Sequence, residues 1–158
     1  MRSRLFLLAF PLLLASIATG QSYTVTDLGL PPGDSYSVGS ALNASGQVAG
    51  GTGTSPSHGF TWSAKQGMVD LPPLHGGIFS AAAGINAGGV VAGFSTIQGG
   101  GTDHAVLWIN GKVQDLGTLA GGTVSVASAI NDARQVAGGS NSAGTDTHAI
   151  LWSKGQGM

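Results

Sequence analysis

The sequence contains no cysteine and no glutamate, and only 8% of its 158 residues are charged. Without cysteine the chain has no disulfide, thiol nucleophile or thiolate metal ligand, so its stability has to come from burial and backbone pairing. The formal net charge is −1, and the six lysines and arginines form no cluster. Because binding to phosphate backbones requires clustered cations, these features exclude nucleic acid as a partner.

Apolar residues and glycine are abundant instead. The chain is 42% hydrophobic and has 28 glycines. This composition is typical of one globular, turn-rich domain and argues against a disordered tail.

The N-terminal segment, "MRSRLFLLAFPLLLASIATG", differs from the rest of the chain. Two arginines, an apolar run and small residues follow one another in the order of a secretory signal peptide cleaved near Gly20. The alternative is a membrane anchor, but a run of about 13 residues interrupted by Pro11 is short against the roughly 20 needed to span a bilayer. We therefore predict a signal peptide at 1–20, a mature domain at 21–158, and no membrane association after cleavage.

The mature domain contains internal repeats. The segments "SVGSALNASGQVAGGT", "SAAAGINAGGVVAGFS" and "SVASAINDARQVAGGS" align without a gap, and their asparagines are 43 and 45 residues apart. In "VTDLG", "MVDLP" and "VQDLG" an aspartate precedes each of these asparagines by sixteen residues. The constant spacing predicts one rigid unit, built around Asp27, Asp70 and Asp115 with Asn43, Asn86 and Asn131.

A third element, "HGFTW", "HAVLW" or "HAILW", completes each repeat. It places His58, His104 and His148 four residues before Trp62, Trp108 and Trp152. The distance from "VAG" to the next histidine differs among the copies, which is typical of loops.

Each repeat of about 45 residues predicts four short strands separated by turn residues. These are the small-residue run before each asparagine, the "VAG" stretch, the His-x-x-x-Trp stretch and the "DL" stretch. Asparagine begins the first turn, since its side chain can hydrogen-bond the backbone two residues on and it tolerates a left-handed conformation. Alternation in "HAVLW" leaves both faces mostly apolar, so we expect this strand to be covered on both sides.

Residues 104–140 resemble the HAF-repeat family of secreted bacterial proteins. The family unit reads approximately His-Ala-Phe-Leu-Trp, then Asp-Leu-Gly-Thr-Leu-Gly-Gly, then Ala-x-x-Ile-Asn-x-x-Gly-Gln-Val-Val-Gly, and about three copies cover nearly all of the mature chain. The name-giving phenylalanine is replaced by Val106 or Ile150, while Phe60 keeps it. The resemblance implies an extracellular location and a repeat array, often propeller-like, but no activity common to the family.

The repeated histidines and tryptophans are best explained as structural. Three histidines must converge within about 2.1 Å of one ion to form a metal site, whereas equivalent positions of a radial array diverge. We expect each ring to hydrogen-bond neighbouring backbone instead. The tryptophans are expected to fill the space between successive sheets, and the alternative is an exposed aromatic platform for sugars.

The repeated aspartates are likewise expected to accept backbone N–H bonds in tight turns. "QGGGTDHA" at 98–105 resembles a glycine-rich calcium nonapeptide only loosely. Asn43 is formally a glycosylation acceptor, but it occupies the shared turn position. No phosphate-binding loop or nucleophile elbow is present in the sequence, and we expect no catalytic, metal or cofactor site.

Four-stranded repeats favour an all-β, partial β-propeller-like array, and three repeats would also suit a β-trefoil. Two details favour the propeller. The side chains of the first strand are too small for a strand of a trefoil barrel. The mature chain also starts with an isolated fourth strand, "YTVTDLG".

We expect a secreted, non-enzymatic repeat protein whose variable loops form a binding or scaffold surface for an unknown protein or glycan. The alternative is a secreted propeller-type hydrolase or lyase acting on glycans, with acidic residues at a channel mouth. The aspartates outside the "DL" position are the first to mutate, namely Asp34, Asp103, Asp132 and Asp146.

Three units do not easily close around an axis, since propellers typically have at least four blades. An open array exposes apolar sheet and unpaired edges, which favours association. We therefore expect residues 21–158 not to form a stable monomer, but to dimerise into a six-blade ring or to be the front part of a longer repeat array.

Overall fold

The chain is all-β, as predicted. The computed structural model describes residues 21–53, 57–98, 101–155 and 157–158, and within them there are eleven strands and no helix. Accordingly, the described part holds no helix long and apolar enough to cross a lipid bilayer. The predicted signal peptide at 1–20 lies outside the described residues.

The strands form three antiparallel sheets, one for each repeat. The first comprises β1 (Ser37–Leu42), β2 (Val48–Thr52), β3 (Gly59–Ser63) and β4 (Gly67–Leu71). The second comprises β5 (Ser80–Ile85), β6 (Val91–Thr96), β7 (Asp103–Ile109) and β8 (Lys112–Asp115). The third comprises β9 (Ser125–Ile130), β10 (Val136–Asn141) and β11 (Thr147–Trp152).

In each sheet the strands are hydrogen-bonded in chain order, so every repeat is a meander. The predicted four-strand unit is thus confirmed for the first two repeats, and the third has three strands in the described residues. None of these sheets closes into a barrel, which the β-trefoil alternative would need.

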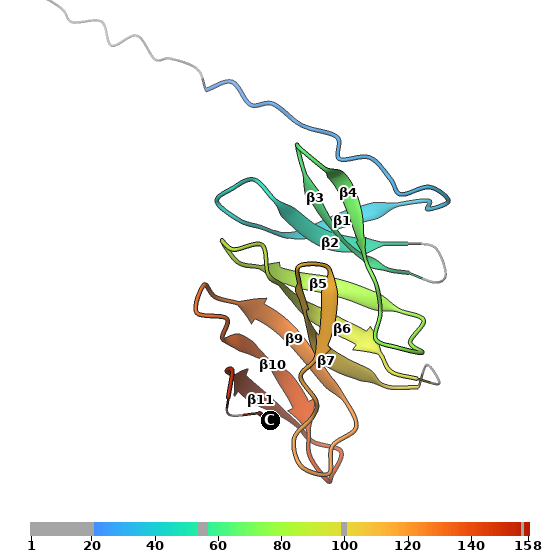
Figure 1. Cartoon of the computed structure of the whole chain (residues 1–158), viewed down its shortest axis with the longest axis vertical. Coiled ribbons are helices and arrows are strands. Elements are labelled where there is room, and N and C mark those ends of the chain that lie inside the picture. Colours follow the sequence, from blue (N-terminus) through green and yellow to red (C-terminus); the bar gives the residue numbers. More distant parts are fainter. Residues whose placement is uncertain (1–20, 54–56, 99–100, 156) are drawn as a thin grey trace, which may run out of the picture.

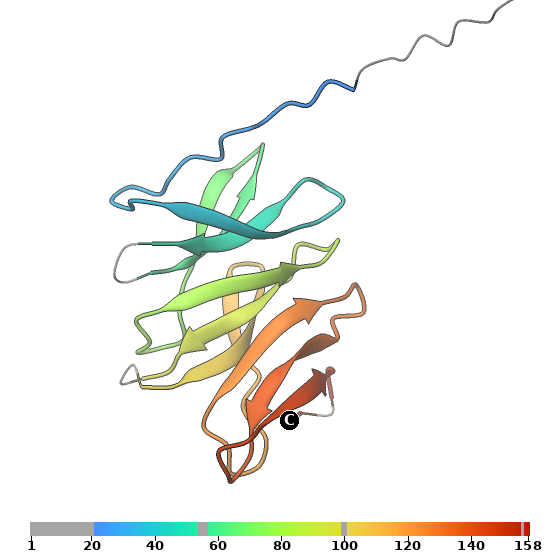
Figure 2. The ribbon, with the colours of Figure 1, turned by 180° about the vertical axis from the view of Figure 1, so that it is seen from behind.

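The three sheets are stacked in chain order along the long axis of the molecule (Figures 1 and 2). Strand β5 packs against β1, β2 and β3, and β9 packs against β5, β6 and β7. Residues 21–30 leave the stack at its first sheet and contain no strand, so the prediction of a strand in "YTVTDLG" is wrong for this structure. The physical reason is that an isolated segment has no neighbouring strand with which to pair its backbone.

Two apolar cores fill the spaces between the sheets. Strand β7 contributes to both, because its side chains alternate between the two faces. Val106 and Trp108 belong to the core shared with the first sheet, whereas Ala105 and Leu107 belong to the core shared with the third. All four are at most 1% exposed, which confirms that this strand is covered on both sides.

Small residues in the first strands allow the sheets to approach closely. A Cβ atom added at Gly84 of β5 would lie 3.3 Å from the Cα atom of Ala129 in β9. Within the second sheet, a Cβ at Gly93 would lie only 2.0 Å from the carbonyl oxygen of Ala81, beside the irregular register of β5 and β6. Glycine in "VAG" is therefore required by the pairing of the first two strands.

Candidate functional site

The tryptophans lie between successive sheets. Trp108 is 1% exposed in the core between the first and second sheets, and its Nε1 donates a hydrogen bond of 2.8 Å to the carbonyl oxygen of Pro72. Trp152 is 7% exposed in the core between the second and third sheets. Trp62 occupies the equivalent position of the first repeat and is half-buried. Burial of Trp108 and Trp152 makes them packing residues, and an exposed sugar platform does not fit either one.

Each of the first two histidines pairs with the aspartate of its own repeat. The Nδ1 atom of His58 lies 3.1 Å from Oδ2 of Asp70, and Nδ1 of His104 lies 2.9 Å from Oδ2 of Asp115. The expectation of a backbone partner is therefore wrong for these two rings. Because the third and fourth strands are antiparallel neighbours, their register brings the histidine and the aspartate to one end of the strand pair.

The expected turn bond of the aspartates is present in two repeats. Oδ1 of Asp27 accepts the N–H of Gly29 at 2.9 Å, and Oδ1 of Asp115 accepts the N–H of Gly117 at 2.8 Å. In the remaining copy the residue two positions after Asp70 is Pro72, which has no N–H to donate. In the second repeat one carboxylate thus holds both its turn and the histidine ring.

The arrangement of these groups does not form a reactive cluster. His58, which directly precedes β3, His104 in β7 and His148 in β11 belong to three different repeats. The described ranges contain no group of three or more histidine or acidic side chains that could hold a metal. The hydroxyl of Ser95, opposite His104 in the register, accepts the N–H of Leu74 and donates to backbone carbonyl oxygens, so it is engaged in structure.

The asparagines form a column that connects the repeats. Oδ1 of Asn86 accepts the N–H of Val90 at 2.9 Å, which closes the turn between β5 and β6. Its Nδ2 donates to the carbonyl oxygen of Asn131 at 3.1 Å, and Nδ2 of Asn43 donates to the carbonyl oxygen of Asn86 at 2.9 Å. The turn role was predicted from sequence, whereas the bond to the next repeat was not.

The left-handed position of this turn is not the asparagine itself. Positive φ angles occur three residues later, at Gly46 (74°), Gly89 (75°) and Arg134 (58°). The asparagines therefore do not use the left-handed conformation that this residue type tolerates. The reason is that the asparagine side chain accepts backbone N–H groups of the turn, and the left-handed residue falls two positions before β2, β6 or β10 begins.

A repeated serine, missed by the sequence analysis, also connects the sheets. Oγ of Ser80 accepts the N–H of Gly59 at 3.0 Å and donates to the carbonyl oxygen of Leu71 at 2.7 Å. Oγ of Ser125 accepts the N–H of Ala105 at 2.8 Å. The sequence did show a serine at the start of each aligned small-residue segment. This serine connects the third strand of one repeat to the first strand of the next.

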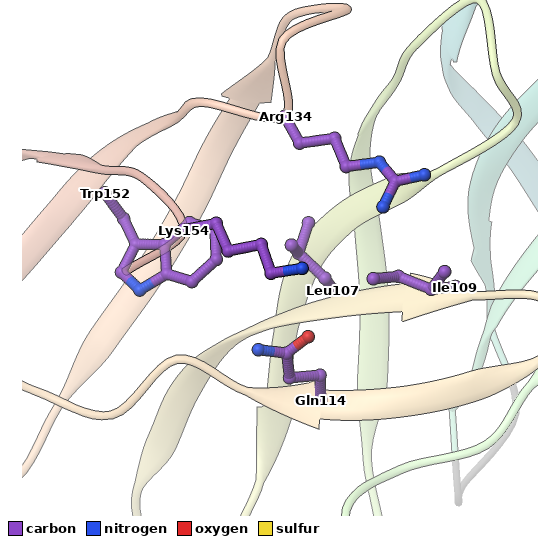
Figure 3. A pocket seen from close by; sticks show the side chains of 6 residues that line it. All are labelled: Leu107, Ile109, Gln114, Arg134, Trp152 and Lys154. Atoms are coloured by element: carbon purple, nitrogen blue, oxygen red, sulfur yellow. The ribbon is translucent and has the colours of Figure 1, made fainter. Parts of the chain in front are cut away.

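A cleft opens at each of the two junctions between sheets. The first has a volume of about 410 Å³, and its lining includes Gln47, Gln66, Asp70, Trp108 and Asn110. The second has a volume of about 80 Å³ and is shown in Figure 3, with a lining of Leu107, Ile109, Gln114, Arg134, Trp152 and Lys154. We call them groove 1 and groove 2.

The two grooves occupy equivalent places in the repeat. Trp152 of groove 2 corresponds to Trp108 of groove 1, and Lys154 corresponds to Asn110, two residues after the tryptophan in each case. Arg134 stands where groove 1 has Gly89. The framework is thus the same at both junctions while the chemistry of the lining changes.

The lining of groove 2 is cationic. Arg134 and Lys154 reach in from the third sheet, and Leu107, Ile109 and Gln114 line the opposite side (Figure 3). Arg134 has a φ of 58°, a conformation that costs a side-chain-bearing residue about 1 kcal/mol relative to glycine. Asn110 of groove 1 also has a positive φ, 51°, so it is the pair of cations that marks groove 2 as the candidate site.

The four other aspartates lie in different parts of the array. Oδ1 of Asp132 accepts the N–H of Ala87 at 2.8 Å, which joins the turns of the second and third sheets. Asp34 precedes β1, Asp103 begins β7, and Asp146 precedes β11. The calcium-like segment at 98–105 falls partly on residues 99–100, which lie outside the described ranges.

Comparisons with protein-family models, curated proteins and solved structures find no match to this chain.

Proposed function

We propose that this protein is a secreted, non-enzymatic repeat protein of the HAF-repeat type whose inter-sheet grooves form a binding surface. The single observation that carries this proposal is the contrast between framework and grooves. Asparagine and serine make equivalent hydrogen bonds at both junctions and each junction buries a tryptophan, while the residues that line the grooves differ in charge. Such a division, with a constant scaffold and variable surface positions, is typical of repeat proteins that bind ligands.

Two further features support the proposal. The pattern at 1–20 is that of a secretory signal peptide. The repeated histidine rings and serine hydroxyls are engaged in structural contacts, as His104 with Asp115 and Ser125 with Ala105 illustrate. In this proposal the stacked sheets are successive blades of a partial propeller-like array.

Groove 2 defines the ligand class by its charge. Two cations over an apolar floor favour a ligand that carries a carboxylate or sulfate group, since an anion gains from both side chains and the small cleft admits one such group. Both cationic side chains are exposed, so the attraction is screened by salt.

The proposal is tested by titrating the chain from residue 21 with oligogalacturonate, an acidic glycan, and with a neutral cello-oligosaccharide of equal length. We expect calorimetry to show binding of the acidic probe alone. Replacing Arg134→Gly and Lys154→Asn, which gives groove 2 the residues of groove 1, should weaken it at least tenfold. Lys112→Asn removes an exposed charge from β8 and serves as the control.

Equal losses in the groove and control variants would refute a site in groove 2, as would equal binding of the two glycans. The same Arg134→Gly variant should be more stable than the natural chain by about 1 kcal/mol, because glycine adopts the positive φ without strain. Chemical denaturation measures this gain, and an unchanged midpoint would show that the backbone at Arg134 is not strained.

A further inference from the structure

Groove 1 is larger than groove 2 because smaller side chains line it. Gly89 stands in place of Arg134, and Asn110 in place of Lys154, whose long side chains extend across groove 2 (Figure 3). The volume is about 410 Å³ in groove 1 and about 80 Å³ in groove 2. Ligand pockets of proteins usually measure roughly 300–1,000 Å³. Groove 1 therefore has room for a whole sugar residue, whereas groove 2 admits a single group.

Hydroxyl and amide groups line the wall of groove 1. Thr61 stands where groove 2 has Leu107, three residues after the histidine in each repeat. The amides of Gln47, Gln66 and Asn110 also belong to the lining. Hydroxyl and amide groups can both donate and accept hydrogen bonds. A ligand with several hydroxyl groups matches such a wall, because hydroxyl groups also do both.

One carboxylate, that of Asp70, belongs to the same lining. The equivalent aspartates, Asp27 and Asp115, each use Oδ1 to accept the N–H of the glycine two residues on. Pro72 takes the place of that glycine after Asp70, and proline has no N–H. Among the described residues nothing hydrogen-bonds Oδ1 of Asp70, while its Oδ2 lies 3.1 Å from Nδ1 of His58. The proline thus leaves one oxygen of an oriented carboxylate available to groove 1.

The lining of groove 1 contains no lysine or arginine, and all of its residues lie in the described ranges. Lys65, next to Gln66, and Lys112, next to Gly111, are not part of it. The free oxygen of Asp70 therefore has no cation of the lining to pair with. An ammonium group on a ligand supplies that partner, and a hydrogen bond between charged groups is roughly twice as strong as a neutral one. The two grooves thus favour ligands of opposite charge.

Two further side chains of the lining are held in place by contacts outside the groove. Nδ2 of Asn43 donates to Oε1 of Gln47 at 2.8 Å, which leaves Nε2 of Gln47 to donate to a ligand. Trp108 is 1% exposed, and its Nε1 donates to the carbonyl oxygen of Pro72 at 2.8 Å. A wall whose side chains are already fixed loses little conformational entropy when a ligand binds.

We propose that groove 1 binds a sugar residue that carries a free amino group, such as glucosamine. This inference rests on the proposed function, in which the inter-sheet grooves bind ligands. Oδ1 of Asp70 accepts a hydrogen bond from the ammonium group, and Thr61, Gln66 and Asn110 bond the hydroxyl groups of the ring. A sugar fits better than the lysine side chain of a peptide, because lysine has no hydroxyl groups and would leave these three side chains without partners.

Three probes test the charge requirement by calorimetry in a weakly acidic buffer, in which the amine of glucosamine carries its proton. They are a glucosamine tetramer, the same tetramer with every amine acetylated, and tetralysine. We expect the free-amine tetramer to bind at least about tenfold more tightly than either of the others. Equal affinity for the two tetramers, or for tetralysine and the free-amine tetramer, would overturn the proposal. Absence of binding by the free-amine tetramer would overturn it as well.

Asp70→Asn removes the charge and keeps the shape of the side chain. Binding of the glucosamine tetramer should weaken at least about tenfold. Asp115→Asn is the matched control, because Asp115 is the equivalent aspartate, pairs with a histidine in the same way and lines neither groove. Thermal melts show whether both variants are folded. An equal loss of binding in the two variants would contradict a site at Asp70.

Asn110→Lys tests the same groove with every native carboxylate in place. It gives groove 1 the cation that groove 2 has at Lys154, so binding of the glucosamine tetramer should fall below detection. Ala120→Lys adds the same charge to an exposed position of the loop between β8 and β9, and should leave the affinity unchanged. Unchanged binding in Asn110→Lys would overturn the proposal.

The variants of the two grooves separate this inference from the proposed function. The combined Arg134→Gly and Lys154→Asn change should leave binding of the glucosamine tetramer unchanged. Asp70→Asn should likewise leave binding of oligogalacturonate unchanged. If oligogalacturonate binds groove 2 and the glucosamine tetramer does not bind, the assignment of groove 1 alone is wrong. If neither probe binds, the proposed function fails too.

Discussion

At the scale of single residues, Asn86 shows how one side chain serves both its own turn and the neighbouring repeat. It is 5% exposed, and its two side-chain atoms bond the N–H of Val90 and the carbonyl oxygen of Asn131. The cost of losing it includes the buried N–H that it leaves without a partner. Asn86 therefore stabilises both its own turn and the junction between the second and third sheets.

We predict that Asn86→Ala lowers the free energy of unfolding by about 2 kcal/mol, because it removes both bonds and leaves a buried donor unsatisfied. Asn86→Gly should cost at least as much, since Asn86 does not have a positive φ and gains nothing from glycine. Urea denaturation measures both. Asn86→Asp is the control that keeps the acceptor of the turn and loses the donor to Asn131. A smaller loss for glycine than for alanine would contradict this account.

The residue scale also shows where sequence reasoning reached its limit. The asparagine turn, the turn bonds of Asp27 and Asp115 and the wedge role of Trp108 follow from local chemistry, which a sequence displays. The bond of Asn86 to Asn131 depends on the stacking distance between two repeats. That distance is a property of the assembled fold, so neither this bond nor the role of Ser80 could be derived from spacing.

At the scale of elements, β7 is the strand that joins the two cores. Its alternate residues enter one core each, and Trp108 packs against residues of the first sheet. The equivalent strand β3 has an outer face with no further sheet in the described residues, which leaves Trp62 half-buried. The tryptophan of the His-x-x-x-Trp motif is therefore expected to contribute different amounts to the free energy of unfolding in different repeats.

Trp108→Ala is expected to cost about 3–5 kcal/mol, the usual range for a fully buried large aromatic. Trp62→Ala should cost less than half as much, because part of that indole is already in water. Thermal melts of the two variants under one set of conditions make the comparison. Similar losses would show that the outer face of the first sheet is covered in solution, and unchanged stability in Trp108→Ala would refute the wedge role.

The strand pattern itself was accessible from sequence. Each of the four predicted elements of the second repeat corresponds to one of the strands β5 to β8. Residues 23–28 were predicted as a strand and are not one here. Their sequence has the alternation of a strand, but a strand exists only with a neighbour, and sequence shows the capacity to pair without showing the partner.

At the scale of the whole molecule, the sheets interact only with their neighbours in the stack as far as the described contacts show. The second sheet is covered on both faces, while the first and third are each covered on one. In such a linear array the stability of a unit depends on how many neighbours it has.

Hydrogen exchange should therefore be slowest in β6 and β7 and faster in β1 and β11. Mass spectrometry of peptides from each strand measures this order at low protein concentration, where chains are separate. Uniform protection across all strands would contradict a linear array.

The column of asparagine amides and the repeated serines have a consequence for the history of this chain. They join one repeat to the next through backbone carbonyl and amide groups, such as those of Asn131 and Gly59, which any residue other than proline provides. If one repeat were duplicated or deleted, the repeats brought together would still present the same backbone groups to each other. Gene segments of this kind can be gained or lost by unequal recombination without a new interface having to evolve, and the groove residues are free to diverge from one copy to the next.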